Sequence, residues 1–186
     1  MNYVTHDQTE AMRLGTKIVV MKDGLAQQIS APLYLYNNPI NKFVAGFIGT
    51  PPMNFLTVKV LERNGKIVCD EGSFEITPTD AQAACLKDYI GKEVSFGIRP
   101  EDLEYSEKPA GKDNMQMKIT NKEPLGAETH LYLVSNKGQS MIAKTTANAE
   151  FRLGDTITVV PNMEKAKFFA LEEGEKNICD NIEVKW

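Results

Sequence analysis

The stretch Tyr3-Val4-Thr5-His6-Asp7-Gln8-Thr9-Glu10-Ala11-Met12 is the part of the sequence against which the rest of the chain is interpreted. A short apolar run leads into a polar turn that holds one of only two histidines, and a helix pattern follows directly. Asp7 and Glu10 suit a helix N-terminus, because a side-chain acceptor can bind the N–H groups that lack partners there. We therefore predict a helix from about Gln8 to Leu14. Such a turn delivers His6 to a helix start, which is where α/β folds bind phosphate groups.

The composition is that of an ordinary soluble protein, with 25% charged and 42% hydrophobic residues in a chain of 186. Residues 50–186 carry 17 basic and 22 acidic side chains, a charge of -5, and residues 1–49 carry +1, which gives the net charge of -4. Because nucleic-acid binding depends on neutralising phosphates, this balance predicts no nucleic-acid partner. No apolar run approaches 18 residues and no signal-peptide pattern is seen, so we expect a cytoplasmic location.

The three cysteines, Cys69, Cys85 and Cys179, are widely spaced and form no CxxC motif. An odd number with this spacing predicts reduced, buried thiols and no metal site.

Residues 1–49 are predicted to form a small mixed α/β unit. Lys17–Met21 and Leu25–Ser30 are apolar runs joined by Asp23-Gly24, the pattern of a β-hairpin. Pro32 begins a short helix that ends near Tyr36. A further helix, capped by Asn41, has an apolar face formed by Phe43, Val44, Phe47 and Ile48.

Gly49-Thr50-Pro51-Pro52 interrupts these patterns. Consecutive prolines favour an extended connector, so we predict a domain boundary here, with one domain at 1–49 and another at 53–186.

The second domain is predicted to be a small barrel of short strands. Nearly regular spacing of alternating segments favours an oligonucleotide/oligosaccharide-binding (OB) type of barrel. One helix is expected at Thr79–Tyr89 and an exposed loop at Lys108–Asn114. The predicted strands are Phe55–Arg63, Lys66–Cys69, Ser73–Thr77, Glu93–Arg99, Met115–Pro124, Glu128–Ser135, Gln139–Thr145, Thr156–Val160 and Lys167–Leu171. The fold class is therefore mainly β.

An ordered series of motifs resembles one family, the ATP-binding subunits of carbohydrate-import ABC transporters (MalK-like). Thr5–Met12 is similar to their switch-histidine segment, the H-loop. The motifs that follow in the family's order are Ile18–Met21 with Asp23-Gly24, Ala31–Tyr36 with Pro39, Phe43–Gly49, Met53–Leu56, Gly97–Leu103 and Leu125–Thr129. The resemblance implies the C-terminal remnant of an ABC nucleotide-binding domain, followed by an OB-like (TOBE) regulatory domain.

The sequence departs from the family pattern in two ways. Leu14 is followed by Gly15-Thr16, where the family usually continues with Leu-Ala-Asp. More importantly, there is no G-x-x-x-x-G-K-[ST] phosphate loop, no LSGGQ-like segment and no Walker B strand. Phosphoryl transfer needs a phosphate cradle and a positioned Mg²⁺. We therefore expect ATP and Mg²⁺ to serve the full-length subunit, and expect this chain alone to bind neither and to hydrolyse no ATP.

Site roles follow from the resemblance. His6 would contact the γ-phosphate as the catalytic and cofactor-binding switch histidine of an intact subunit, and would be inactive in isolation. Asp7, Arg99, Glu101 and Glu128 are candidates for regulatory or interface contacts.

Each candidate has a simpler structural alternative. Arg99 and Glu101 either contact a ligand or partner, or form a local ion pair that braces Pro100, and the structural role is favoured. His6-Asp7 also matches the HD pair of metal phosphohydrolases, but His130 is predicted to be structural, so the metal reading is weak.

Two groups of apolar side chains have alternatives of the same kind. The apolar helix face at residues 43–48 would pack on the ATPase half, or would be an exposed patch prone to self-association. A set of aromatic residues forms either a stacking surface or, as favoured, the core. These are Phe96, Tyr105, Tyr132, Phe168 and Phe169.

The resemblance thus predicts a regulatory fragment of an importer for sugars or related solutes. Its barrel would pair with a second copy, and the complete subunit would bind the transporter's membrane subunits and a regulatory protein, peripheral to the cytoplasmic membrane. The alternative is a free-standing OB-type module that binds a ligand or nucleic acid.

Overall fold

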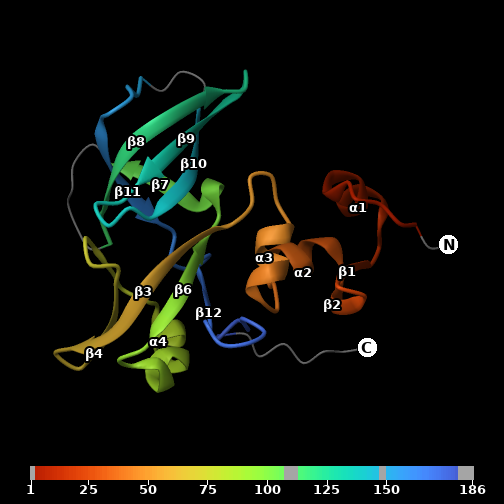
Figure 1. Cartoon of the computed structure of the whole chain (residues 1–186), viewed down its shortest axis with the longest axis horizontal. Helices are drawn as coiled ribbons and strands as arrows, with labels where there is room; N and C mark the ends of the chain where they lie inside the picture. The colour runs from red at the N-terminus through yellow and green to blue at the C-terminus, as the bar shows by residue number, and fades with distance from the viewer. Residues whose placement is uncertain (1–2, 107–112, 147–149, 180–186) are drawn as a thin grey trace.

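Two curved antiparallel sheets form the body of the molecule in a computed structural model that describes residues 3–106, 113–146 and 150–179 (Figure 1). The first sheet has the strand order β10-β9-β8-β11-β7, and the second has the order β12-β6-β3-β4-β5. The first contains β7 (Leu103–Ser106), β8 (Met115–Pro124), β9 (Glu128–Val134), β10 (Ser140–Thr146) and β11 (Thr156–Pro161). The second contains β3 (Asn54–Arg63), β4 (Lys66–Asp70), β5 (Glu75–Ile76), β6 (Glu93–Ile98) and β12 (Lys167–Phe169). The molecule is mainly β, as the sequence predicts.

One hydrophobic core fills the space between the two sheets. Phe96 and Phe168 lie at its centre with their rings 5.6 Å apart, and both are fully buried, as is Phe169. Tyr105 packs at the edge of this core, whereas Tyr132 is half-buried and donates a hydrogen bond to Glu123. The core alternative is therefore correct for the three phenylalanines.

Helix α4 (Asp80–Leu86) packs at one end of the second sheet and buries Leu86 in the same core. Thr79 and Gln82 form a reciprocal capping box at its start. The single helix predicted for Thr79–Tyr89 is in fact α4 followed by a 3₁₀ turn at Lys87–Tyr89.

Side-chain amides join the two sheets where their strands do not pair. Asn54 on β3 donates to the carbonyl of Ile142 and accepts from its N–H, both at 2.7 Å. Gln139, just before β10, donates to the carbonyl of Thr57 at 2.9 Å and accepts from its N–H at 2.6 Å. Each amide makes the two hydrogen bonds that a neighbouring strand would make, and so the barrel is nearly closed between β3 and β10.

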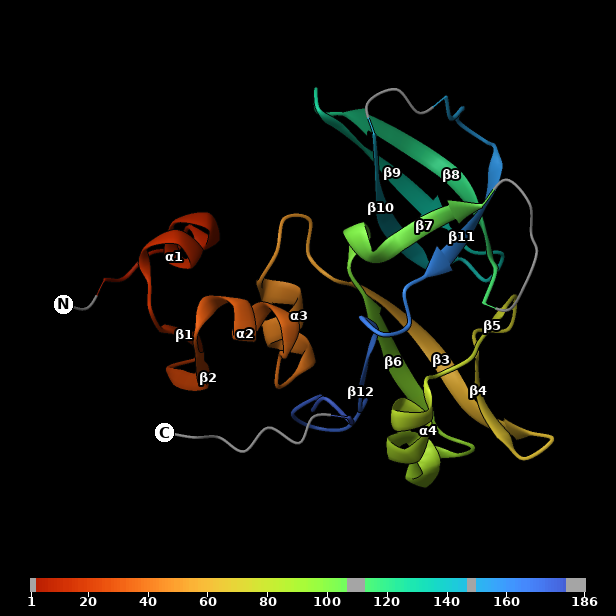
Figure 2. The same cartoon turned by 180° about the vertical axis from the view of Figure 1, so that it is seen from behind.

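Residues 3–49 form a smaller unit beside the barrel (Figures 1 and 2). Its elements are α1 (Gln8–Leu14), β1 (Ile18–Lys22), β2 (Leu25–Ser30), α2 (Pro32–Asn37) and α3 (Lys42–Phe47). Asp7 and Asn41 cap α1 and α3, as their positions predict. The side chains of Ile18, Val20, Leu35, Val44 and Ile48 make a separate small core.

This small core corrects the expectation for the apolar face of α3. Val44 and Ile48 are buried inside residues 3–49, so they are available neither to an ATPase half nor to a second copy. Only Phe47 remains 42% exposed, with its ring stacked on that of Phe43. The face turns inward because the β1–β2 hairpin folds back over it.

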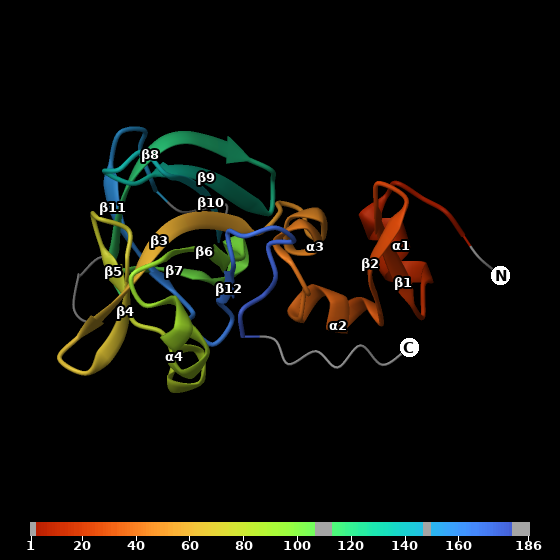
Figure 3. The ribbon, with the colours of Figure 1, turned by 60° about the horizontal axis from the view of Figure 1, so that its bottom comes forward.

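Backbone contacts cross the predicted boundary near Pro51. The segment after β12 reaches α3 (Figure 3), where the N–H of Lys42 donates to the carbonyl of Glu175. Asn177 binds the carbonyls of Pro39 and Ile40. The division into 1–49 and 53–186 remains a prediction, and the two parts are in direct contact.

Three other predictions need adjustment. Strand β7 was not predicted, and the strand predicted at Ser73–Thr77 is only Glu75–Ile76. Most of the predicted loop at residues 108–114 lies outside the described residues.

Of the cysteines, only Cys69 is fully buried, and burial raises the pKa of its thiol to about 12. Cys85 on α4 and Cys179 on the C-terminal segment are half-buried. In the part of the chain that is described, no helix is long and apolar enough to cross a membrane.

Replacing Asn54 by alanine tests the closure of the barrel. The Asn54→Ala substitution leaves the N–H and carbonyl of Ile142 without the two 2.7 Å partners, so we expect a loss of about 2 kcal/mol in the free energy of unfolding. Urea unfolding followed by circular dichroism measures the loss. Asn121→Ala, an exposed amide on β8, is the control and should change stability by less than about 0.5 kcal/mol. Equal effects of the two substitutions would contradict the closure.

Candidate functional site

The turn that carries His6 is fixed by the side chains on either side of it. Thr5 Oγ1 accepts from the N–H of Asp7 at 3.0 Å and donates to Glu10 Oε2 at 2.8 Å. Asp7 Oδ1 in turn accepts from the N–H of Glu10 at 3.0 Å and so caps α1. His6 itself is exposed. The turn therefore presents His6 on the surface, held by these hydrogen bonds, and Asp7 is one of the residues that fix the turn.

The next residue, Gln8, reaches a distant peptide group. Gln8 Oε1 accepts a hydrogen bond from the N–H of Gly49 at 3.0 Å. The carbonyl of Ile48, on the other edge of the same peptide plane, accepts from Arg99 Nη1 at 2.7 Å. One peptide group, Ile48–Gly49, is thus held between a residue of α1 and a residue at the end of β6. We call this arrangement the peptide clamp.

Arg99 also binds the end of a second helix. Its Nη2 donates to the carbonyl of Tyr36 in α2 at 2.7 Å, and the guanidinium carbon lies 3.6 Å from the centroid of the Tyr36 ring. The side chain is only 3% exposed. The carbonyls at helix C-termini carry partial negative charge, which favours a cation there. Burial lowers the pKa of Arg99, and the nearby Tyr36 and Glu101 oppose this shift, so the guanidinium stays charged.

These contacts correct the predicted pairing of Arg99 with Glu101. Among the described residues, Arg99 donates to two carbonyls, and the Glu101 carboxylate accepts from the hydroxyl of Tyr36 instead. Burial, followed by this hydrogen bond, raises the pKa of Tyr36 to about 12. Arg99 and Glu101 therefore act together, but they join α2 to the barrel and do not simply brace Pro100.

Gly49 is required by the geometry of the clamp. Its φ of +123° is in the region that favours glycine. A Cβ atom at this position would lie 2.8 Å from Arg99 Nη1 and 3.2 Å from the carbonyl oxygen of Pro51. Any side chain here would displace the guanidinium from the Ile48 carbonyl.

An apolar contact supports the same junction. Ala45 on α3, Met53 and Phe169 form a small buried cluster, with Phe55 packed against it. The Lys42–Glu175 ion pair, at 3.2 Å, lies at its edge. The smaller unit is thus attached to the barrel by the clamp, by this cluster and by the C-terminal segment.

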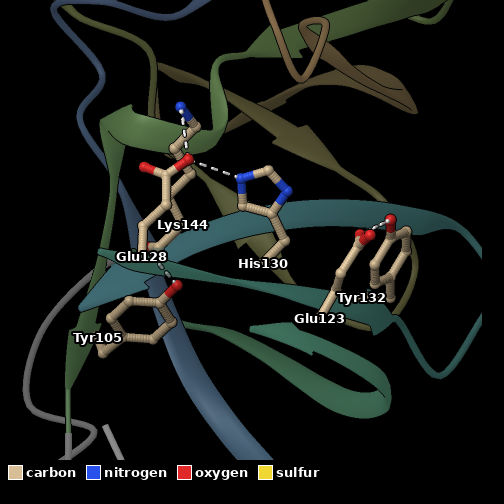
Figure 4. A network of polar contacts seen from close by, with 6 residues as sticks. All are labelled: Tyr105, Glu123, Glu128, His130, Tyr132 and Lys144. Carbon is tan, nitrogen blue, oxygen red and sulfur yellow. Dashed lines mark hydrogen bonds and ion pairs between the residues drawn. The ribbon is translucent and has the colours of Figure 1, made fainter. Parts of the chain in front are cut away.

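Glu128 belongs to a separate polar group on β9 and β10 (Figure 4). Its Oε1 lies 2.9 Å from His130 Nε2 and 3.5 Å from Lys144 Nζ, while the Tyr105 hydroxyl donates to the carbonyl of Lys144. The hydrogen bond with His130, and then Lys144, lower the pKa of Glu128. His130 is 7% exposed, so it is a partnered, largely buried histidine. In residues 3–106, 113–146 and 150–179, no cluster of three or more His, Cys, Asp or Glu side chains is arranged to hold a metal ion.

The structure thus separates the predicted site residues into three places. Asp7 and His6 lie at the start of α1, Arg99 and Glu101 lie at the clamp, and Glu128 lies on β9. Sequence reasoning missed Gln8 and Tyr36 altogether, and Gly49 was noted only as a chain break. A glycine directly before Thr50-Pro51-Pro52 was the one signal of a special backbone site. The sequence has no phosphate loop to accompany His6.

Comparison with known proteins shows which families and relatives the chain resembles. The family described as the MalK OB fold domain matches residues 49–103, and the TOBE domain matches residues 96–169. The chain is similar to the oligosaccharides import ATP-binding protein MsmX of Bacillus subtilis, with 43% identity over 176 residues, covering 91% of this chain and 47% of that protein. It is also similar to the trehalose/maltose import ATP-binding protein MalK of Thermococcus litoralis, with 38% identity over 178 residues, covering 93% and 47%. The chain therefore spans about half the length of the curated relatives it matches.

A solved structure shows the same fold. The cytoplasmic molybdate-binding protein ModG aligns with a TM-score of 0.51 over 62% of this chain and 94% of that chain. At 14% sequence identity this likeness concerns the fold alone.

Replacing Arg99 tests the clamp. Arg99→Met removes two charge-assisted hydrogen bonds from buried carbonyls, and we expect a loss of about 3 kcal/mol in unfolding free energy. Arg99→Lys should recover only part of this loss, because an ammonium group lacks the planar fork that reaches both carbonyls.

Arg63→Met is the matched control. Arg63 is 52% exposed and pairs with Glu75 at 2.6 Å on the surface, so its loss should cost less than about 1 kcal/mol. Urea unfolding of the four proteins measures the differences. A lysine variant as stable as the parent would argue against the clamp.

Proposed function

This chain belongs to the family of MalK-like ATP-binding subunits of ABC importers and corresponds to their C-terminal part, and we propose that it couples the switch-histidine segment to a regulatory barrel. The complete subunit would drive the uptake of oligosaccharides or related solutes. The named activities of the relatives support this substrate class. The free-standing ligand-binding module has less support, because the relatives match across the smaller unit as well as the barrel.

The peptide clamp is the observation that carries the proposal. Gln8 lies two residues after His6, and Arg99 lies in the barrel, yet both bind the peptide between Ile48 and Gly49. The helix that follows His6 therefore cannot shift relative to the barrel without breaking one of two hydrogen bonds. Coupling between distant sites requires a physical connection of this kind.

The two bonds of the clamp differ in strength. A hydrogen bond between neutral groups contributes about 1 kcal/mol, whereas one from a charged group contributes about 1.5–3 kcal/mol. The bond from Gly49 to Gln8 would therefore break first when the turn moves. Arg99 would then keep α2 and α3 attached to the barrel while α1 and His6 reposition.

The remaining parts of the proposal come from the family. The barrel would pair with a second copy, so that two complete subunits stay together while their ATP-binding faces open and close. The membrane subunits of the importer and a regulatory protein would be the other partners, and the subunit would lie at the cytoplasmic face of the membrane. The complete subunit would bind and hydrolyse ATP with Mg²⁺. His6 would be the residue that this chain contributes to that ATP site.

Solution measurements on the purified chain test this assignment. We expect sedimentation equilibrium to give the mass of a dimer at high protein concentration, because the barrel contains the pairing surface. We also expect no release of phosphate from ATP above the buffer rate. A strictly monomeric species would refute the pairing, and sustained ATP turnover would refute the assignment as a regulatory part.

A further inference from the structure

A polar pocket lies where the smaller unit meets the barrel. Its walls come from the end of α2, from the 3₁₀ turn at Pro100–Asp102, and from the segment that leads into β12. Its volume is about 390 Å³, which is within the range of pockets that bind small molecules. Tyr36 and Arg99 also line it, so it lies directly beside the peptide clamp. We call it the junction pocket.

The charges around the junction pocket cancel one another. Six charged side chains line it, three of them basic and three acidic. They are Arg99, Lys165, Lys167, Glu101, Asp102 and Glu164. An anion in the pocket would meet three carboxylates, and a cation would meet three basic groups. The balance of charge therefore favours an uncharged ligand.

Most polar side chains of the pocket are not used by the protein itself. In the part of the chain that the structure describes, six lining side chains take part in no side-chain hydrogen bond and no ion pair. They are Asn37, Asn38, Asp102, Glu164, Lys165 and Lys167. Together they offer amide and ammonium donors and carboxylate and amide acceptors. By contrast, Arg99 and Glu101 already bind groups of α2 and α3, so they serve as a fixed wall.

Asp102 indicates what kind of group the ligand should carry. It is half-buried, whereas Glu101 and Glu164 are exposed. Burial, followed by the charge of Glu101, raises the pKa of Asp102. A half-buried carboxylate without a hydrogen-bond donor is costly, and O–H groups of a ligand would supply the missing donors.

We propose that the junction pocket binds a neutral carbohydrate whose hydroxyl groups bond to these six side chains. Sugar hydroxyls both donate and accept, so they match a wall that mixes donors with acceptors and has no net charge. The choice of a sugar among neutral hydroxyl-rich ligands rests on the proposed function, because the named relatives import oligosaccharides and trehalose or maltose. The ligand would then be the imported product itself.

A sugar in the junction pocket would act on the peptide clamp. Arg99 and Tyr36 line the pocket, and the same guanidinium holds the carbonyls of Ile48 and Tyr36. A ligand that bonds to Asn38 at the end of α2 and to Asp102 in the barrel adds a further connection across this junction. Imported sugar would therefore strengthen the attachment of the smaller unit to the barrel, and the product of transport would be coupled to the subunit that drives it.

Calorimetric titration of the purified chain with maltose and with trehalose tests the binding. We expect at least one of the two sugars to bind with a Kd of about 1 mM or lower. The double variant Asp102→Ala/Lys167→Met removes one acceptor and one donor from the pocket and keeps the net charge. It should weaken the binding about tenfold or more.

A second double variant controls for the loss of the same side-chain types elsewhere. Lys66→Met/Asp88→Ala changes two exposed residues, at the start of β4 and in the 3₁₀ turn after α4, and should bind sugar like the parent. Circular dichroism checks that both variants melt as folded proteins.

Hydrogen exchange of the parent chain locates the site without any substitution. The bound sugar should slow exchange of the Gly49 N–H, because that group belongs to the clamp beside the pocket. Inorganic phosphate, titrated under the same conditions, should not bind.

Four results would overturn the inference. They are no binding of either sugar up to about 10 mM, equal affinities of the two double variants, slowed exchange only in segments away from the junction, or phosphate binding that the Asp102→Ala/Lys167→Met variant abolishes. The last would show a site for anions. A chain that dimerises, hydrolyses no ATP and binds neither sugar would refute this inference alone, whereas ATP turnover would refute the proposed function whatever the titration gives.

Discussion

The arrangement of the two parts depends on one peptide group, between Ile48 and Gly49, that is bound on both edges. Arg99 holds the carbonyl edge from the barrel, and Gln8 holds the N–H edge from the helix after the histidine turn. A guanidinium that is 97% buried would be costly without partners, but here two helix-end carbonyls and an aromatic ring surround it. Breaking such a cluster costs far more than loosening a surface ion pair, so the clamp is a strong connection between the two parts.

A related arrangement appears twice in the barrel. Asn54 and Gln139 each use a side-chain amide to bind both polar groups of a residue on the facing sheet. In both places an amide side chain continues backbone hydrogen bonding across a gap that strand pairing does not cover. Buried peptide groups need partners, and these amides provide them without a continuous ladder. The sheets and the smaller unit are therefore joined by a few specific contacts as well as by apolar packing.

The sequence predicts local structure well, because local structure follows from local patterns. Alternation located most strands of the barrel, Asp23-Gly24 located the hairpin turn, and Asn41 located a helix cap. The short strand β7 was missed because it follows a proline turn and offers only four residues of pattern. Arg99 was selected as a candidate contact residue, but its partners lie 51 and 63 positions away and have no signature in the sequence. The role of Gln8 was invisible for the same reason, since a surface glutamine near a helix start gives no hint of a partner 41 residues later.

A double-mutant cycle between Gln8 and Arg99 tests the clamp most directly. Unfolding free energies are measured for the parent chain, Gln8→Ala, Arg99→Met and the double variant. If both side chains hold one peptide group, the loss of Arg99 frees that group to turn, and the second loss then costs less than it does alone. We predict a coupling energy of at least about 0.5 kcal/mol, as found for residues that share a partner. Losses that simply add, to within about 0.3 kcal/mol, would contradict the account.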